Sequence, residues 1–253
     1  MRRLRFGLSG FASPFLRDRL YGDTPPQHWL DAYSAHFGCY EVTGTADEAW
    51  DATASERLAE LAPPHLRLLP RHPGAANAAW AQACAPLLRR RASGPVYLPW
   101  NGPWTARRHD ALERLLGTLW DTLPPSGRVA VEFADAGWLR SDVMAMLEMH
   151  EAGLVWSTRP GIVPYKVTAD FLYLRLTGYQ TRRTGDEVAA LLERLRNRPV
   201  DDREVFVVSS RCTEAYGLHA VERFAQGMGQ PWLARPPVPA QVGLQRYAVA
   251  ATS

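Results

Sequence analysis

The sequence predicts an α/β protein built as one (β/α)8 barrel, that is, a single-domain TIM barrel. Short apolar runs alternate with amphipathic stretches roughly eight times over 253 residues, as this fold requires. Runs such as Val129-Ala-Val131 are apolar on both faces, which is typical of parallel strands covered by helices. A doubly wound open sheet is the main alternative. It lacks support because Gly7-Leu-Ser-Gly10 is too short for a dinucleotide-binding fingerprint.

Each predicted strand is a short apolar run between turn signals or helical patterns. In chain order, we predict strands at residues 4–9, 39–43, 66–69, 95–98, 129–133, 153–157, 171–176 and 204–209.

The predicted helices carry apolar residues at helical spacing. The first, residues 26–37, begins after Pro25-Pro26, a favourable helix start, and places Trp29 and Tyr33 on one side. Another helix-like segment ends in the basic run Arg89-Arg90-Arg91, which suits the negative end of a helix dipole. Further helices are predicted at residues 106–122, 186–196 and 213–228.

The predicted barrel occupies residues 1–229, and residues 230–253 form a proline-rich C-terminal extension. Four prolines fall between Pro231 and Pro239, which favours an extended strap over a helix.

Composition predicts a soluble cytoplasmic protein. The chain is 46% hydrophobic and 22% charged, and its net charge of +3 is too small to indicate nucleic-acid or membrane partners. Cys39, Cys84 and Cys212 are far apart and follow no metal or redox spacing. The N-terminus lacks the apolar region of a secretory signal, and no apolar run is long enough to span a bilayer.

Glu132 is the first candidate functional residue. It lies in the apolar run Val129–Phe133, so its carboxylate is expected near the end of a buried strand. A charge in that position is costly unless it has partners or a chemical role.

Several blocks of sequence occur in the order expected for one known family. They are Gly7-Leu-Ser-Gly-Phe11, Tyr40-Glu41-Val42, Val129-Ala-Val-Glu-Phe133 with Trp138, and Asp170-Phe-Leu-Tyr-Leu-Arg175 closing on Gly178. Together they resemble the domain of unknown function 72 family, also called YecE-like. The resemblance runs from about residue 5 to residue 225. It implies a TIM barrel but no particular activity.

The chain departs from the family motifs at many polar positions. These are Arg71 in place of a lysine, Tyr97 in place of a glutamine, Ala134 and Asp135 in place of arginine and histidine, Thr177 in place of a histidine, and Val208-Ser209-Ser210 in place of Phe-Asn-Asn. The resemblance therefore implies a retained scaffold whose polar lining has been exchanged.

The working face of a TIM barrel is formed by the C-terminal ends of its strands. Glu41, Arg71, Glu132 and Arg175 fall at or near such ends. Two guanidinium groups could bind a carboxylate or phosphate, and a carboxylate with a raised pKa could act as a general acid or base. Alternatively, Glu132 and Arg175 form an ion pair that only holds the mouth together.

Other candidate ligand-binding residues lie near predicted strand ends or in the loops that follow. Asp135 is equally explained as a turn or capping residue, and Trp138 as a packing anchor. His219 follows the last strand and could reach the mouth as an acid or base. The remaining candidates are Tyr97, Thr177 and Ser209.

We predict no cofactor. Asp135 and His72 could join Glu41 and Glu132 around a divalent metal ion, but no paired-ligand spacing supports such a site.

Two classes of function remain open. In the first, the barrel binds a small polar or anionic molecule, or a protein partner, at its mouth and has lost catalysis. In the second, it is a hydrolase or isomerase-like enzyme that uses Glu132 and Glu41 as acid and base. The exchanged polar lining favours the first. A mouth plugged by Trp100 or Tyr97 would argue against the second.

Overall fold

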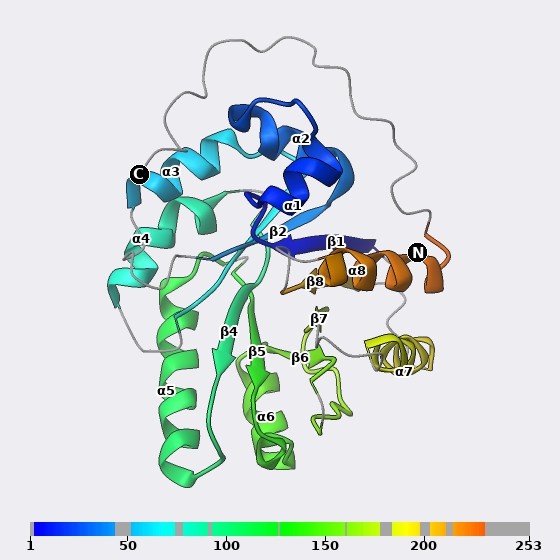
Figure 1. Ribbon diagram of the computed structural model, residues 1–253. Helices are drawn as coiled ribbons and strands as arrows, with labels where there is room; N and C mark the ends of the chain where they lie inside the picture. Colours follow the sequence, from blue (N-terminus) through cyan, green and yellow to red (C-terminus); the bar gives the residue numbers. More distant parts are fainter. Residues whose placement is uncertain are drawn as a thin grey trace.

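Eight parallel strands form one sheet that curls into a nearly closed barrel, with helices on its outside (Figure 1). The computed structural model describes residues 3–43, 52–73, 78–90, 93–125, 127–159, 161–177, 184–197, 203–210 and 215–230. Within them the fold is a single-domain (β/α)8 TIM barrel, as predicted.

All eight predicted strands are confirmed, with ends that shift by at most two residues. They are β1 (Arg3–Ser9), β2 (Cys39–Val42), β3 (Arg67–Pro70), β4 (Val96–Trp100), β5 (Val129–Phe133), β6 (Gly153–Ser157), β7 (Phe171–Leu176) and β8 (Glu204–Ser209).

The helices agree less completely with the predictions. They are α1 (Pro14–Leu16), η1 (Arg17–Tyr21), η2 (Pro26–His28), α2 (Trp29–His36), α3 (Ala52–Leu61), α4 (Ala78–Arg89), α5 (Ala106–Thr122), η3 (Ala136–Trp138), α6 (Ser141–Met149), α7 (Thr184–Arg196) and α8 (Ala215–Gly227). The bounds of α5 match the prediction, and only the end of α4 was foreseen. Sequence reasoning missed α3 and α6.

Helix α5 shows why the clearest sequence pattern folds as expected. The Thr105 side chain caps its N-terminus by accepting a hydrogen bond from the backbone N–H of Arg108 (3.3 Å). The leucines at positions 112, 115, 116 and 119 are all buried, and their spacing places them on one face of the helix. Among the described helices, none is long and apolar enough to cross a membrane.

The strand order is β3-β2-β1-β8-β7-β6-β5-β4, so closing the barrel requires β3 to meet β4. Two isolated parallel bridges make this contact, Leu68 with Ser93 and Arg71 with Tyr97. The backbone N–H of His72 adds a hydrogen bond to the carbonyl of Tyr97 (2.8 Å). The seam between β3 and β4 is therefore held by a few bonds rather than by a continuous ladder.

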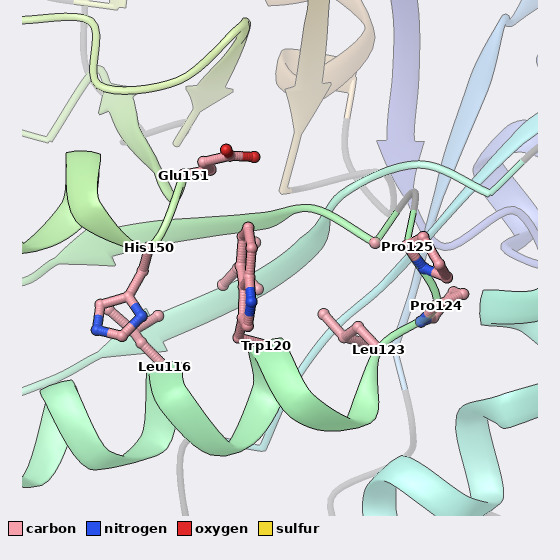
Figure 2. Close-up of a pocket in the computed structure, with 9 residues that line it drawn as sticks. Leu116, Trp120, Leu123, Pro124, Pro125, His150 and Glu151 are labelled. Carbon is pink, nitrogen blue, oxygen red and sulfur yellow. The ribbon is translucent and has the colours of Figure 1, made fainter.

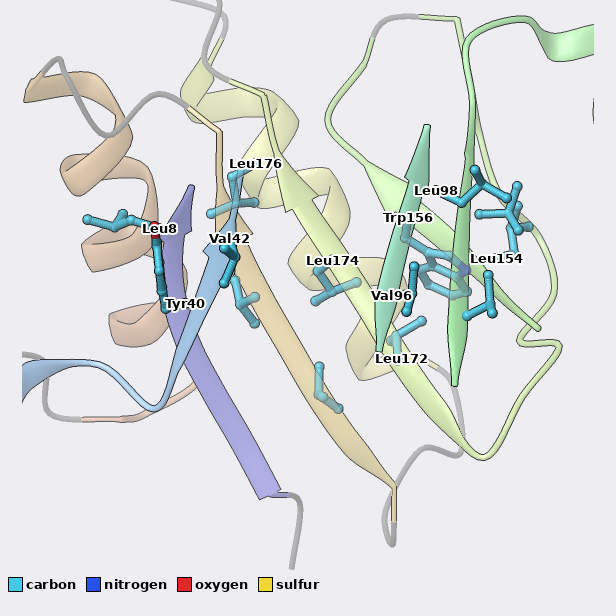
Figure 3. Packing of buried hydrophobic residues seen from close by; sticks show 14 of the residues in the cluster. Leu8, Tyr40, Val42, Val96, Leu98, Leu154, Trp156, Leu172, Leu174 and Leu176 are labelled. Atoms are coloured by element: carbon cyan, nitrogen blue, oxygen red, sulfur yellow. The ribbon is translucent and has the colours of Figure 1, made fainter. Parts of the chain in front are cut away.

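Alternate side chains of each strand point to opposite faces, and this divides the core in two. Outward-facing residues such as Leu8, Trp156 and Leu174 belong to the large cluster between the sheet and the helices (Figure 3). A smaller cluster fills the barrel interior and consists of Cys39, Leu69, Tyr97, Ala130, Val155, Phe171, Tyr173, Phe206 and Val208.

Gly7 is required where β1 passes β2. A Cβ atom at this position would lie 2.2 Å from the backbone carbonyl oxygen of Cys39. The two strands can pair at this separation only because residue 7 has no side chain.

Some predicted features lie outside the described residues. These are Gly178, Cys212 and the proline-rich segment from residue 231 onward. The domain boundary at residue 229 stays a prediction.

Candidate functional site

A polar cluster lies at the C-terminal ends of the strands, beyond the apolar interior of the barrel. Glu41 of β2, Glu132 of β5 and Arg175 of β7 face the barrel interior because they share strand parity with the interior cluster. All three are buried, with exposed fractions of 0%, 3% and 4%. The structure therefore brings together three of the four charged residues expected at the mouth.

Glu41 is satisfied by donors from two sides. The Ser9 hydroxyl donates to its Oε1 atom (2.8 Å), and the Tyr173 hydroxyl donates to its Oε2 atom (2.8 Å). Arg175 donates from Nη1 to the same Oε2. A buried carboxylate with three donors is well compensated, so Glu41 is built into the barrel as an internal anion.

Glu132 differs because, among the described residues, only one of its oxygens has a hydrogen bond. The Tyr97 hydroxyl donates to Oε2, and Arg175 Nε lies 3.7 Å from the same oxygen. Oε1 has no hydrogen-bond partner among the described residues. Nε of Arg159 lies 3.8 Å from it, and that nitrogen also lacks a hydrogen-bond partner in the described part of the chain.

The aromatic ring of Tyr97 packs against the charged side chains of this cluster. The guanidinium carbon of Arg175 lies 4.0 Å from its ring centre, and that of Arg71 lies 5.7 Å from it. The Tyr97 ring also stacks on the Tyr173 ring, at a centroid distance of 5.7 Å. Arg71, the fourth predicted charge, thus reaches the cluster through Tyr97 rather than through a carboxylate.

The protonation states of this cluster follow from burial and charge. Burial raises the pKa of both Tyr97 and Tyr173, and the neighbouring glutamates raise it further, so both phenols stay neutral donors. Burial by itself would lower the pKa of Arg175. The charge of Glu41 and further contributions from Tyr97, Tyr173 and Glu132 outweigh that effect, and the pKa of Arg175 lies above its ordinary value. Arg175 is therefore a permanent cation.

Two predicted site residues serve the loop after β5. Asp135 caps η3, because its Oδ1 accepts a hydrogen bond from the backbone N–H of Gly137 (2.9 Å). Trp138 is fully buried, stacks on Phe133 at 5.0 Å and donates from its indole nitrogen to the carbonyl of Gly102 (3.1 Å). Both have the structural roles that the sequence offered as alternatives.

Three further predicted residues do not join the cluster. Thr177 is bonded to Thr158, whose Oγ1 accepts from its backbone N–H (2.9 Å) and lies 3.2 Å from its hydroxyl. Ser209 pairs in register with Leu8, an outward-facing residue, so it lies on the opposite face from Val208 and the barrel interior. His219 is exposed on α8 and contacts Glu222 at 3.0 Å.

His72 lies apart from the carboxylates that it was proposed to join around a metal. Its ring packs against Trp80 at a centroid distance of 4.6 Å, and it is buried. Among the described residues, the one group with metal-ligand proximity is His109, Asp110 and Glu113 on the surface of α5. The mouth residues are not such a group.

The burial of His72 predicts a pH dependence of stability. Burial lowers its pKa from 6.5 to about 4, so its contribution to stability is fully present above pH 6.5 and is lost as the pH falls toward 4. The loss should approach about 3 kcal/mol. In urea unfolding, His72→Gln should gain stability relative to the wild type between pH 7 and pH 4.5. A constant difference between the two proteins across this range would contradict the prediction.

Sequence reasoning missed Tyr173 and Arg159. Tyr173 lies two residues before Arg175 on the same strand, so the alternation that placed Arg175 in the barrel also places Tyr173 there. Arg159 lies two residues after Ser157, the last residue of β6. Alternation beyond the strand end is not guaranteed, so the sequence carried only a weak signal for Arg159.

A cavity lies away from this cluster, on the outside of the barrel. Its volume is about 330 Å³, and none of the predicted site residues line it. Figure 2 shows Leu116 and Trp120 on α5 and Leu123 just beyond its end, with His150 and Glu151 coming from the segment that follows α6. The cavity and the mouth are separate features.

Known proteins share this fold. A DUF72 family protein from Enterococcus faecalis V583 is 16% identical, with a TM-score of 0.71 over 90% of this chain and 96% of that chain. A DUF72 family protein from Thermotoga maritima MSB8 is 18% identical, with a TM-score of 0.69 over 90% of this chain and 100% of that chain. No curated protein matches the sequence. The family model described as "Protein of unknown function DUF72" matches residues 5–242, and the chain therefore belongs to the DUF72 family.

Proposed function

We propose that the mouth of the barrel binds a small molecule that carries both an anionic group and a hydrogen-bond donor. The pair formed by Glu132 and Arg159 carries this proposal. Their facing atoms, Oε1 and Nε, are 3.8 Å apart, which is too long for a hydrogen bond. Each lacks a hydrogen-bond partner among the described residues. A bound molecule that donates to Glu132 and accepts from Arg159 would satisfy both groups.

The charges at the mouth favour an anion. Arg159 and Arg175 lie beside the carboxylates of Glu41 and Glu132, and Arg71 adds a third guanidinium group on the Tyr97 ring. Arg175 is already bound to Glu41 and packed on Tyr97. Arg159 and Arg71 are only partly buried, so they are the two that can contact an incoming carboxylate or phosphate.

The burial of the carboxylates favours a small molecule over a protein partner. Glu132 is 3% exposed, so a ligand must enter the barrel to reach its Oε1 atom. Trp100 belongs to the cluster outside the sheet and does not plug the mouth. Tyr97 lies in the barrel interior, where it forms the bottom of the mouth.

The same geometry bears on the alternative, a hydrolase or isomerase-like enzyme. Glu41 uses both oxygens to accept three hydrogen bonds, which suits a positioning role better than proton transfer. Glu132 has one oxygen without a hydrogen-bond partner among the described residues, so any acid–base chemistry at this mouth would use Glu132. Binding without chemistry is the function that these contacts support best.

Thermal shift with three probes tests the proposal. Glycerol 3-phosphate carries an anion and hydroxyl donors, whereas sulfate supplies only the anion and glycerol supplies only the donors. We expect glycerol 3-phosphate to stabilise the wild type most, by about 2.7 kcal/mol at one hundred times its dissociation constant. Glu132→Gln and Arg159→Gln should each weaken its binding by about tenfold or more, as expected for loss of a charge-assisted hydrogen bond.

Arg114→Gln is the matched control, because Arg114 is an exposed arginine on α5, outside the mouth cluster. It should bind glycerol 3-phosphate as the wild type does. Equal shifts for the wild type and both mouth variants, or equal shifts with the three probes, would rule the proposal out.

A further inference from the structure

We propose that the cavity on the outside of the barrel, between α5 and the turn that follows α6, binds a small aromatic amine. The ring of the amine lies against Trp120, and its ammonium group pairs with Glu151. This site is independent of the mouth and of the function proposed for it.

The cavity forms where the ends of two helices meet. Leu116 and Trp120 belong to α5, residues 123–125, 127 and 129 lead from α5 into β5, and His150 and Glu151 lie in the turn after α6 (Figure 2). Its volume of about 330 Å³ falls at the lower end of the range of small-molecule pockets, which is about 300–1,000 Å³. The cavity therefore suits a molecule with one ring rather than a large ligand.

Most of the wall is apolar, and its largest side chain is exposed. Leu116 and Val129 are buried, whereas Trp120 is 52% exposed. Among the described residues only three other large hydrophobic side chains are exposed, and one of them is Met149, next to His150. An exposed indole beside a cavity gains when an aromatic ring covers it, because both partners then bury apolar surface.

Glu151 holds its place at this cavity at a conformational cost. It is the only non-glycine residue in the described part of the chain with a positive φ, at 50°. The backbone N–H of Ala152 donates to the carbonyl of Leu147 (2.8 Å), and that of Glu151 donates to the carbonyl of Glu148 (3.1 Å), which is the pattern of a Schellman motif at the end of α6. Glycine is the usual residue at this position, because a side chain is disfavoured there. The turn itself therefore does not explain why a carboxylate stands beside the cavity.

The charges around the cavity favour a cation. Among the described residues that line it, only His150 and Glu151 are titratable. The neighbouring Glu148 is already paired with Lys166 at 2.7 Å, whereas no ion pair holds Glu151 in the part of the chain that the structure describes. An ammonium group on Glu151 compensates this charge, and the face of an indole also attracts a cation.

His150 supplies a second acceptor for the same ammonium group. Its Nε2 atom is buried and has no hydrogen-bond partner among the described residues. The ring is packed over α5, where its Cε1 atom lies 4.0 Å from the point that a Cβ atom on Gly117 would occupy. A neutral imidazole nitrogen accepts a hydrogen bond and an ammonium group has three donors, so one amine can serve both His150 and Glu151.

Ligand-observed NMR titration of the full-length protein with phenethylamine tests this site. Phenethyl alcohol keeps the ring without the charge, and ethylamine keeps the charge without the ring. We expect phenethylamine to bind with a dissociation constant on the order of 1 mM, and each comparison molecule to bind about fivefold more weakly or worse. Equal binding of phenethylamine and phenethyl alcohol, or of phenethylamine and ethylamine, overturns the proposal.

Variants of the cavity locate the binding. Trp120→Ala and Glu151→Gln should each weaken phenethylamine binding by about fivefold. Glu148→Gln is the matched control, because Glu148 lies near the same helix end but is paired with Lys166, and it should bind as the wild type does. Unchanged binding in Trp120→Ala or in Glu151→Gln contradicts the proposed site.

Glu151→Gly separates a binding role from a structural one. Because glycine adopts a positive φ freely, this variant should raise the Tm by about 2 °C while it weakens phenethylamine binding as Glu151→Gln does. A residue with only a structural role predicts the rise in Tm without the loss of binding, and wild-type binding in Glu151→Gly overturns the proposal.

Two further measurements exclude other occupants. Glu132→Gln changes only the mouth and should bind phenethylamine as the wild type does. Loss of binding in Glu132→Gln would place the amine in the mouth and overturn this site, while the function proposed for the mouth keeps its own test. Size-exclusion chromatography should give the same oligomeric state for the wild type and Trp120→Ala. A wild-type dimer that dissociates in Trp120→Ala would make the cavity a contact between copies of the chain and overturn the proposal.

Discussion

Replacing Arg175 with methionine is expected to lower the free energy of unfolding by about 3–5 kcal/mol. Arg175 is the cation shared by Glu41 and Glu132, both of which are buried. Its removal leaves two carboxylates in the barrel without their common counter-ion. Urea unfolding at pH 7 measures the loss, provided that the slope of the transition is unchanged.

Two further variants show that the effect comes from the buried charge. Arg159→Met removes a partly exposed guanidinium group near Glu132 and should lower the free energy of unfolding by no more than about 1 kcal/mol. The double variant Arg175→Met with Glu41→Gln should lose less than the sum of the single changes, because the unpaired charge is removed together with its partner. A strictly additive double variant would contradict this interpretation of the cluster.

Trp138→Ala should be comparably damaging, at about 3–5 kcal/mol, because it empties a large, fully buried site. The indole stacks on Phe133, meets Trp100 edge-on at 6.3 Å and anchors the loop after β4 through Gly102. Thermal or urea unfolding checks the prediction.

Trp138→Phe is the matched control, since it keeps an aromatic ring and loses the indole N–H. It should recover more than half of the stability lost in Trp138→Ala. Were Trp138 chiefly a ligand-binding residue, both variants would retain wild-type stability and differ only in glycerol 3-phosphate binding.

The strands could be predicted because a covered parallel strand must be apolar on both faces, and each such run is bounded by polar or turn residues. The helices were harder. Helix α3 has the sequence ATASERLAEL, in which Leu58 and Leu61 are the only large apolar residues, so its apolar face is too sparse to stand out in the sequence. Helix α6 is only nine residues long, too short for a repeating pattern to stand out.

In the candidate site, too, residues within strands were easier to predict than residues in the loops that follow them. Glu41, Glu132 and Arg175 were found because they lie within strands, where alternation and strand order fix the direction of a side chain. Ser209 is a strand residue of the wrong parity, one position beyond the inward-facing Val208. Asp135 and Trp138 follow a strand end, where loop geometry rather than periodicity decides what a side chain contacts.

The weak seam between β3 and β4 links ligand binding at the mouth to the closure of the barrel. Arg71 and Tyr97 face each other across it, and Tyr97 also holds Glu132. A ligand that contacts Arg71 and Glu132 together would add a link across this seam, which is otherwise joined by two isolated bridges and a few backbone hydrogen bonds. A ligand bound at the mouth would then stabilise the closed barrel. The expected sign is slower local opening of the backbone hydrogen bonds in β3 and β4, on both sides of the seam.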